Sequence, residues 1–149
     1  MQNRLEQFTL LINNIYRSIQ KIKLEELKKF GLKGSYMTCI HYLGISDRDL
    51  SFKELCNLCG EDKSLISKNL KSLIELEIVN KDSEGDKIYK SKFALSQKGK
   101  EIFEKIEKKT NAICSNVYLD KSENELQVFY SNLKEISAKL NEEIINLRS

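Results

Sequence analysis

The chain of 149 residues has the length of one ordinary domain, and its 40% apolar and 32% charged residues permit a packed core. The absence of proline and the presence of only six glycines exclude collagen-like, Pro-rich and Gly-rich linker architectures and favour helices. The net charge of +3 is too small to indicate a nucleic-acid-binding protein by itself.

Neither a membrane span nor a secretory signal is predicted. No apolar run approaches the roughly 20 residues that a transmembrane helix requires, and polar residues interrupt the N-terminal segment every few positions. The four cysteines (Cys39, Cys56, Cys59 and Cys114) are too few and too irregularly spaced for a secreted disulfide framework. We therefore expect a cytoplasmic protein that does not contact a membrane.

The first third of the chain is predicted to be helical. Apolar residues recur at spacings of three and four over residues 5–22, which places them on one face of a long helix, and Leu27 and Phe30 continue its apolar character. Ser35 is then expected to cap a short helix over residues 36–43, and the polar residues 46–49 to form a turn.

The middle of the chain predicts two short helices separated by a glycine. Ser51 and Glu54 have the spacing of a capping box at the start of the first helix, which Gly60 interrupts after about two turns. A second helix is expected to begin near Asp62, with its apolar residues at helical spacing.

The stretch over residues 77–95 changes its period and predicts a single two-stranded hairpin. Its turn is expected at 82–86, and Tyr89, Phe93 and Leu95 are expected on one side of the second strand.

Two long amphipathic helices complete the prediction. Ser96 can cap the first of them, and Ser122 with Glu125 forms a second capping box for the last.

This order of elements, a capped helix, a glycine turn, a second helix and a hairpin, is typical of a winged helix-turn-helix. The face of the second helix that is predicted to point outward carries three ammonium groups and two hydroxyl groups, with no acidic residue between positions 63 and 74. Such groups suit phosphates and base edges. The candidate DNA-binding residues are Lys63, Ser64, Ser67, Lys68 and Lys71 of the helix and Lys81, Lys87, Lys90 and Lys92 of the hairpin. A solvated lysine-rich face on a generic helical protein is the alternative, but a plain helical bundle gives no reason for the hairpin.

Several of these residues resemble the motifs of MarR-type regulators. The stretch 55–68 with Leu73 is similar to their helix-turn-helix core, and Leu95-Ser96-Gln97-Lys98-Gly99 is similar to the Leu-Thr-x-x-Gly segment that follows their wing. The resemblance extends over the whole chain in length and element order. It implies a mainly α fold with one small β-hairpin, in which residues 35–96 form the winged DNA-binding region and residues 1–34 and 97–149 form a helical dimerisation region, all in one structural unit.

The resemblance also implies a function, and the sequence departs from the family's pattern in two places. MarR-type proteins are homodimers that bind pseudo-palindromic double-stranded DNA, usually as repressors that a small ligand, oxidation or a metal releases. Where they often have glycine, this chain has Glu77, so the entry into the wing is expected to differ. Their wing carries an Asp-x-Arg pair, whereas here Asp86 is followed by Lys87 and Ile88, so the wing's minor-groove arginine is missing.

The terminal helices require a partner for their apolar faces. One monomer of this size would have to cover all of these faces at once, whereas two-fold dimerisation covers them and matches a palindromic operator. An antiparallel pair within one subunit is the alternative. The candidate dimerisation residues are Leu5, Phe8, Ile12, Ile15, Leu133, Ile136, Leu140 and Ile144.

No catalytic constellation, cofactor site or strong metal site is predicted. Cys56 and Cys59 lack a second ligand pair for zinc and are expected to be core or half-exposed residues. Cys39 and His41, the single histidine, are weak candidates for a metal site. We therefore expect a regulator rather than an enzyme. A metal- or thiol-responsive sensor of the same fold and a protein-binding helical adaptor with a vestigial winged domain remain as alternatives.

Overall fold

The computed structural model describes residues 3–83 and 88–149, so the predicted DNA-binding residue Lys87 lies outside the described residues. The chain divides into two compact units, residues 1–112 and residues 113–149, which are described separately. Within the described ranges, no helix has both the length and the apolar character needed to cross a membrane.

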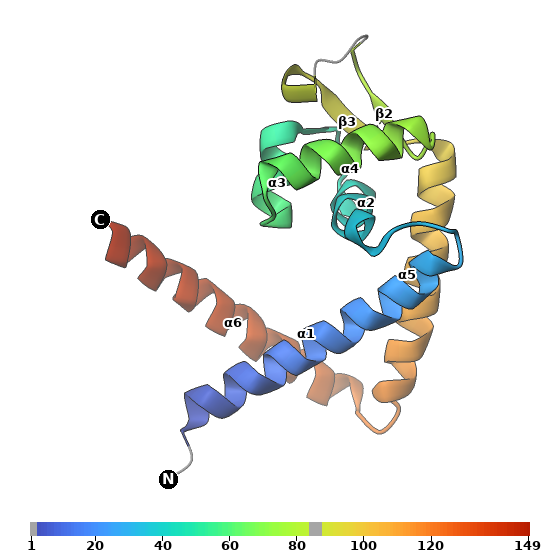
Figure 1. Cartoon of the computed structure of the whole chain (residues 1–149). Coiled ribbons are helices and arrows are strands. Elements are labelled where there is room, and N and C mark those ends of the chain that lie inside the picture. The colour runs from blue at the N-terminus through green and yellow to red at the C-terminus, as the bar shows by residue number, and fades with distance from the viewer. Residues whose placement is uncertain (1–2, 84–87) are drawn as a thin grey trace. The chain divides into compact units, whose positions relative to one another are not determined.

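The first unit is a set of helices with a small sheet at one end (Figure 1). Its helices are α1 (Arg4–Lys28), the short 3-10 turn η1 (Gly34–Tyr36), α2 (Met37–Ile45), α3 (Phe52–Cys59), α4 (Lys63–Glu75) and most of α5 (Gln97–Val117). The strands are β1 (Leu50–Ser51), β2 (Val79–Lys81) and β3 (Lys92–Leu95), and a second 3-10 turn, η2 (Ile88–Lys90), precedes β3. The mainly helical winged fold predicted from the sequence is confirmed.

The predicted hairpin is confirmed as β2 and β3, but it is not a lone two-stranded hairpin, because β1 adds a third antiparallel strand in the order β1-β3-β2. Leu50 pairs with Phe93, and Val79 pairs with Leu95. The strand β1 has only two residues, which is too short for an alternating pattern in the sequence. It is recognised as a strand only because Leu50 pairs with Phe93 of β3, 43 positions later. Tyr89 lies in η2 rather than in the strand, and its side chain is 70% exposed.

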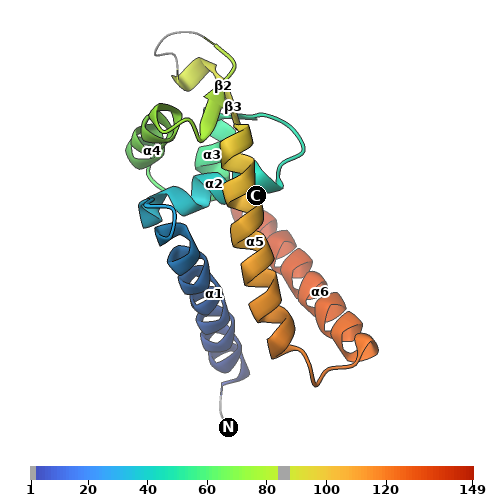
Figure 2. The same ribbon diagram turned by 90° about the vertical axis from the view of Figure 1, so that its right-hand side faces the viewer.

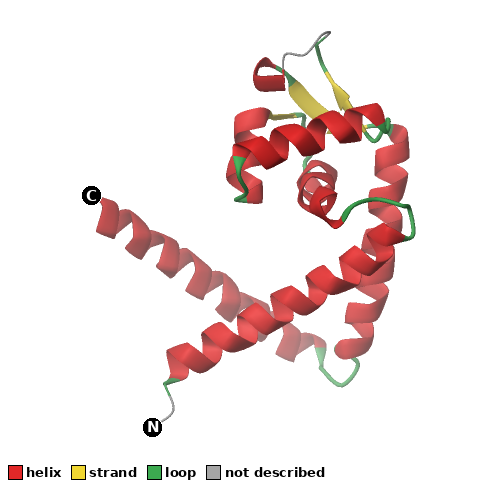
Figure 3. Ribbon diagram, viewed as in Figure 1, coloured by secondary structure: helices red, strands yellow, loops and turns green. Residues whose placement is uncertain are grey.

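The core lies where α2, α3 and α4 pack beneath this sheet (Figure 3). Its largest fully buried side chains include Phe93 of β3, Ile40 of α2, Leu55 of α3 and Leu70 of α4. Burial of one such side chain stabilises the folded state by about 1.5–3 kcal/mol. This core fixes α4 on its inner face and leaves its outer face to solvent.

Local capping signals decide where most helices begin. The two predicted capping boxes are confirmed: the Ser51 hydroxyl accepts from the Glu54 N–H, and the Ser122 hydroxyl accepts from the Glu125 N–H. Ser35 is not the cap of α2, because its hydroxyl instead donates to Oδ1 of Asn69 on α4. β3 leads almost directly into α5, the transition being visible in Figure 2.

The second unit contains the end of α5 and the helix α6 (Glu123–Arg148). The amphipathic pattern predicts this helix correctly. No residue of α6 is buried within the chain, although the helix carries many large apolar side chains. A helix with such an uncovered apolar face depends on packing for its stability.

Candidate nucleic-acid interface

The helix α4 presents a basic surface that its own packing orients. Ile66, Leu70 and Leu73 are fully buried on its inner face. The left-handed Gly60 (φ 64°) ends α3 and allows the tight turn into α4. The opposite face is solvent-exposed and carries Lys63, Ser64, Lys68 and Lys71.

Asn69 anchors this helix and was not recognised from the sequence. Its side chain is buried, and its Nδ2 donates to the Ser35 carbonyl oxygen at 2.9 Å. The sequence gives no sign of this role, because it depends on the hydrogen bond to Ser35 of η1, 34 positions away in the chain. The bond connects α4 to the segment before α2.

Ser67 does not project outward as predicted. Ser67 is only 9% exposed, whereas the neighbouring apolar residue Leu65 is 37% exposed. The helix is therefore rotated slightly from the predicted orientation, because Ile66 and Leu70 fill the core and bring Ser67 to the edge of the buried face.

The wing supplies a second group of cations. Lys90 and Lys92 are exposed, and Lys81 is partly exposed. Asp82 holds the two sides of the wing together: its Oδ1 accepts from the Lys92 N–H at 2.8 Å, and its own N–H donates to the Lys92 carbonyl oxygen at 3.0 Å. Lys81 and Lys92 are thereby placed at the base of the wing on adjacent strands.

A groove of about 400 Å³ separates α4 from η2 of the wing. Its lining consists of Ser64, Ser67, Lys68, Lys71 and Ser72 of α4 and Tyr89 of η2. The Tyr89 ring stands edge-on against Phe52 of α3, with 4.7 Å between the ring centroids. Tyr89 is thus held in place from behind while its exposed side faces the groove.

The entry into the wing contains the only non-glycine residue with positive φ among those the structure describes. Glu77 has φ 60° and follows the last turn of α4. The Glu77 N–H donates to the Ile74 carbonyl and the Ile78 N–H to the Leu73 carbonyl, both at 2.9 Å, which is the Schellman arrangement. The backbone at Glu77 therefore keeps the left-handed conformation that glycine favours. The expected difference from MarR-type proteins at the entry of the wing is a strained residue, and the course of the backbone is the same as with glycine.

The segment after the wing requires both Ser96 and Gly99. The Ser96 hydroxyl accepts from the Gly99 N–H at 3.0 Å and donates to the Glu77 carbonyl at 2.6 Å. A Cβ atom on Gly99 would lie 2.2 Å from the Ile78 carbonyl oxygen. These contacts explain the Leu-Ser-x-x-Gly motif, because they bind the start of α5 to the entry of the wing.

A buried polar cluster joins three helices of the first unit. Lys23 of α1 is 8% exposed in its side chain and donates to Glu107 of α5 at 2.8 Å. Its Nζ also lies 3.3 Å from Nδ1 of His41 on α2. Burial and the Lys23 ammonium lower the pKa of His41, against the opposing effect of the Glu107 carboxylate. The neutral imidazole is therefore favoured.

Cys39 and His41 make contacts with different partners. The Cys39 thiol is buried and hydrogen-bonds to Cys59, which raises the pKa of Cys39 and lowers that of Cys59. Cys56 is buried and Cys59 is half-buried, which agrees with the predicted core or half-exposed positions. In the described ranges, no group of three or more His, Cys, Asp or Glu side chains is arranged to hold a metal ion.

Six of the eight predicted dimerisation residues are exposed in the single chain, and the other two are half-buried. On α1, Leu5, Ile12 and Ile15 are exposed and Phe8 is half-buried. On α6, Ile136, Leu140 and Ile144 are exposed and Leu133 is half-buried. Each helix, taken by itself, presents an apolar stripe to solvent.

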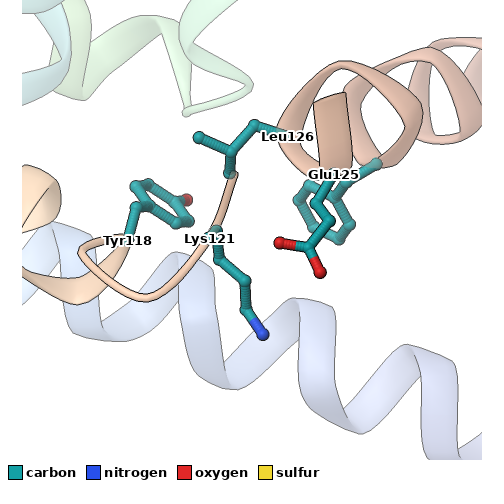
Figure 4. Close-up of a pocket in the computed structure, with 5 residues that line it drawn as sticks. Tyr118, Lys121, Glu125 and Leu126 are labelled. Atoms are coloured by element: carbon teal, nitrogen blue, oxygen red, sulfur yellow. The ribbon is translucent and has the colours of Figure 1, made fainter. Parts of the chain in front are cut away.

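An apolar cleft of about 330 Å³ lies in the second unit, at the turn between α5 and α6 (Figure 4). Tyr118, Lys121, Glu125, Leu126 and Phe129 line it. The Tyr130 hydroxyl donates to the Tyr118 hydroxyl at 3.4 Å, across the same turn. The cleft combines two aromatic rings with one ammonium group and one carboxylate, that of Glu125, which accepts from the Ser122 N–H. Sequence reasoning placed no site here.

Comparison with known proteins shows the fold but no close relative. No protein-family model matches the sequence, and no curated protein matches it. Two solved structures align with a TM-score of 0.77 each: a MarR family protein from Bacillus stearothermophilus and the Staphylococcus aureus MarR in complex with salicylate and kanamycin. The first is 18% identical over 95% of this chain and 99% of that chain, and the second is 19% identical over 93% of both.

A MarR/EmrR family transcriptional regulator from Acinetobacter sp. ADP1 aligns with a TM-score of 0.70, at 20% identity over 94% of this chain and 99% of that chain. The chain thus has the winged helix fold of the MarR-family transcriptional regulators along nearly its whole length. The resemblance inferred from the sequence motifs is confirmed at the level of the fold.

Proposed function

We propose that this chain is a sequence-specific DNA-binding transcriptional regulator. The observation that carries the proposal is the exposed face of α4, which bears Lys63, Ser64, Lys68 and Lys71 opposite a fully buried apolar face. In this proposal Ser64 and Lys68 contact base edges, and Lys63 and Lys71 contact phosphates, together with the wing residues Lys81, Lys87, Lys90 and Lys92.

A gel shift against the DNA upstream of its own coding region, with a salt titration, tests this proposal. Lysines contribute affinity by displacing counterions, so binding should weaken steeply with salt. Lys68→Ala should weaken operator binding by about 1–3 kcal/mol if Lys68 reads a base. Lys105→Ala, at an exposed lysine of α5, serves as the control. Unchanged affinity in Lys68→Ala would argue against α4 as the reading helix, and no DNA binding at all would favour a protein-binding adaptor.

The regulator is proposed to act as a homodimer. The exposed apolar stripes of α1 and α6 support this, since Leu5 is 68% and Leu140 is 53% exposed in the single chain. A two-fold dimer would cover them and would present two copies of α4 to a palindromic site. Sedimentation should show a dimer at micromolar concentration and a monomer for Leu140→Glu. A wild-type monomer at that concentration would contradict the proposal.

Repression released by a small effector is the proposed mode of action. The S. aureus MarR structure contains salicylate, and the cleft beside Tyr118 and Phe129 offers aromatic surface and the Lys121 ammonium to a small aromatic acid. Salicylate should then raise the Kd for DNA in the wild type and not in Phe129→Ala. A wild-type Kd that stays constant at millimolar salicylate would exclude this class of effector.

A thiol-responsive sensor is a second candidate, favoured by the hydrogen bond between Cys39 and Cys59. The lowered pKa of the half-buried Cys59 increases its thiolate fraction, and thiolates react with peroxides. Peroxide would convert the thiolate to a sulfenic acid, which would condense with the Cys39 thiol to a disulfide and release water. Loss of DNA binding on peroxide treatment, absent in Cys59→Ser, would support it. Zinc content after purification tests the metal-responsive alternative.

A further inference from the structure

We propose that the groove between α4 and η2 binds one phosphate group of the DNA backbone and that Tyr89 is a DNA-contacting residue. This inference rests on the proposed DNA-binding function and adds a site to it. The short turn η2 packs against α3, and its Tyr89 faces α4 across the groove.

The lining of the groove has the chemistry of an anion site. The Ser67, Ser72 and Tyr89 hydroxyls can donate hydrogen bonds, and Lys71 supplies a positive charge. Ser64 and Lys68, which are proposed above to contact base edges, complete the lining. Among the residues that the structure describes, no carboxylate lines the groove. A phosphodiester offers two charged acceptor oxygens, which match such donors better than a base edge does, because base edges also present donors and methyl groups.

Ser67 is the second observation that points to a ligand. Its side chain is nine-tenths buried and lines the groove. Its hydroxyl forms no hydrogen bond with any part of the chain that the structure describes. A recessed hydroxyl cannot reach a base edge beyond Lys68 and Tyr89, but it can meet an oxygen that enters the groove. Ser67 is therefore assigned to a phosphate instead of a base.

Tyr89 occupies the place next to the missing wing arginine. Ile88, which stands where MarR-type wings carry arginine, is 2% exposed and belongs to the core, so that position cannot contact DNA. Tyr89 is fixed edge-on against Phe52 and exposes its other side. A ring held in this way loses little side-chain freedom on binding, which favours its use as a contact.

Fluorescence anisotropy with a mixed-sequence 30-base-pair duplex and with the upstream DNA tests the site. Tyr89→Phe removes only the hydroxyl and keeps the ring against Phe52. The loss of a hydrogen bond to a charged acceptor should weaken binding to both duplexes by the same factor, about ten- to a hundredfold. Ser67→Ala should show the same uniform loss. Tyr16→Phe, at an exposed tyrosine of α1, is the matched control and should not change either Kd.

The salt dependence separates this site from other roles. Tyr89→Phe should leave the slope of log Kd against log salt unchanged, whereas Lys71→Ala should reduce it by about one. Unchanged binding in Tyr89→Phe and Ser67→Ala, or a loss confined to the upstream DNA, would overturn the inference. Failure of the wild type to bind either duplex would overturn the proposed function itself. In that case, millimolar inorganic phosphate that perturbs the Tyr89 ring resonances in NMR spectra would identify a site for free phosphate and not for DNA.

Discussion

The strained residue at the entry of the wing offers a direct test of the backbone geometry. Glu77 follows α4 in the left-handed conformation, with φ 60°, at the position where a Schellman motif favours glycine. Its side chain is exposed and forms no hydrogen bond or ion pair with the described part of the chain. Glu77→Gly should therefore stabilise the fold by releasing strain without removing a contact.

The magnitude follows from two opposing terms. The left-handed conformation costs about 1–2 kcal/mol for a residue with a Cβ atom. Glycine in turn loses about 0.5–1 kcal/mol more conformational entropy on folding than alanine. We expect a net increase in the free energy of unfolding of about 0.5–1 kcal/mol, which corresponds to a rise in Tm of roughly 1–4 °C for a chain of this size.

Urea denaturation at equal subunit concentrations would measure this change, because the stability of an oligomer depends on concentration. Glu77→Ala keeps the Cβ atom and the strain, so its midpoint should match that of the wild type. Gly60→Ala provides the reverse case: Gly60 has φ 64° and open space around a Cβ atom, so only strain is added, and a loss of about 1 kcal/mol is expected. A Glu77→Gly variant that is no more stable than Glu77→Ala would show that the left-handed conformation at this position stores no strain.

Three further predictions concern the first unit. Gly99→Ala should reduce the free energy of unfolding by about 1–3 kcal/mol in the same urea assay, because its Cβ atom would meet the Ile78 carbonyl at 2.2 Å; a wild-type midpoint would contradict the close approach. Glu107→Gln should destabilise by about 3 kcal/mol, since it leaves the buried Lys23 ammonium without its counterion, and Lys23→Met in that background should recover most of the loss. The lowered pKa of His41 means that the unfolded chain binds more protons, so stability should fall as the pH drops below the ordinary value of 6.5, and His41→Gln should flatten this part of the pH profile.

The sequence by itself determined the elements whose signals are local. Helical spacing of apolar residues predicted α1, α4, α5 and α6, and the Ser51 and Ser122 capping boxes marked two helix starts correctly. These signals lie within a few residues of one another, so they can be recognised without a tertiary structure. The lysine-rich face of α4 was predicted for the same reason, from residues spaced three and four apart.

Only the tertiary structure decided the features that depend on residues far apart in the chain. β1 exists because Leu50 pairs with Phe93, and Ser67 is recessed because the core fixes the rotation of α4. The pairing of Lys23 with Glu107 spans 84 positions and leaves no trace in any local pattern. The groove between Tyr89 and α4 likewise depends on the packing of η2 against α3. Periodicity gives the faces of each helix, but the contacts between elements determine which side chains on those faces reach a ligand.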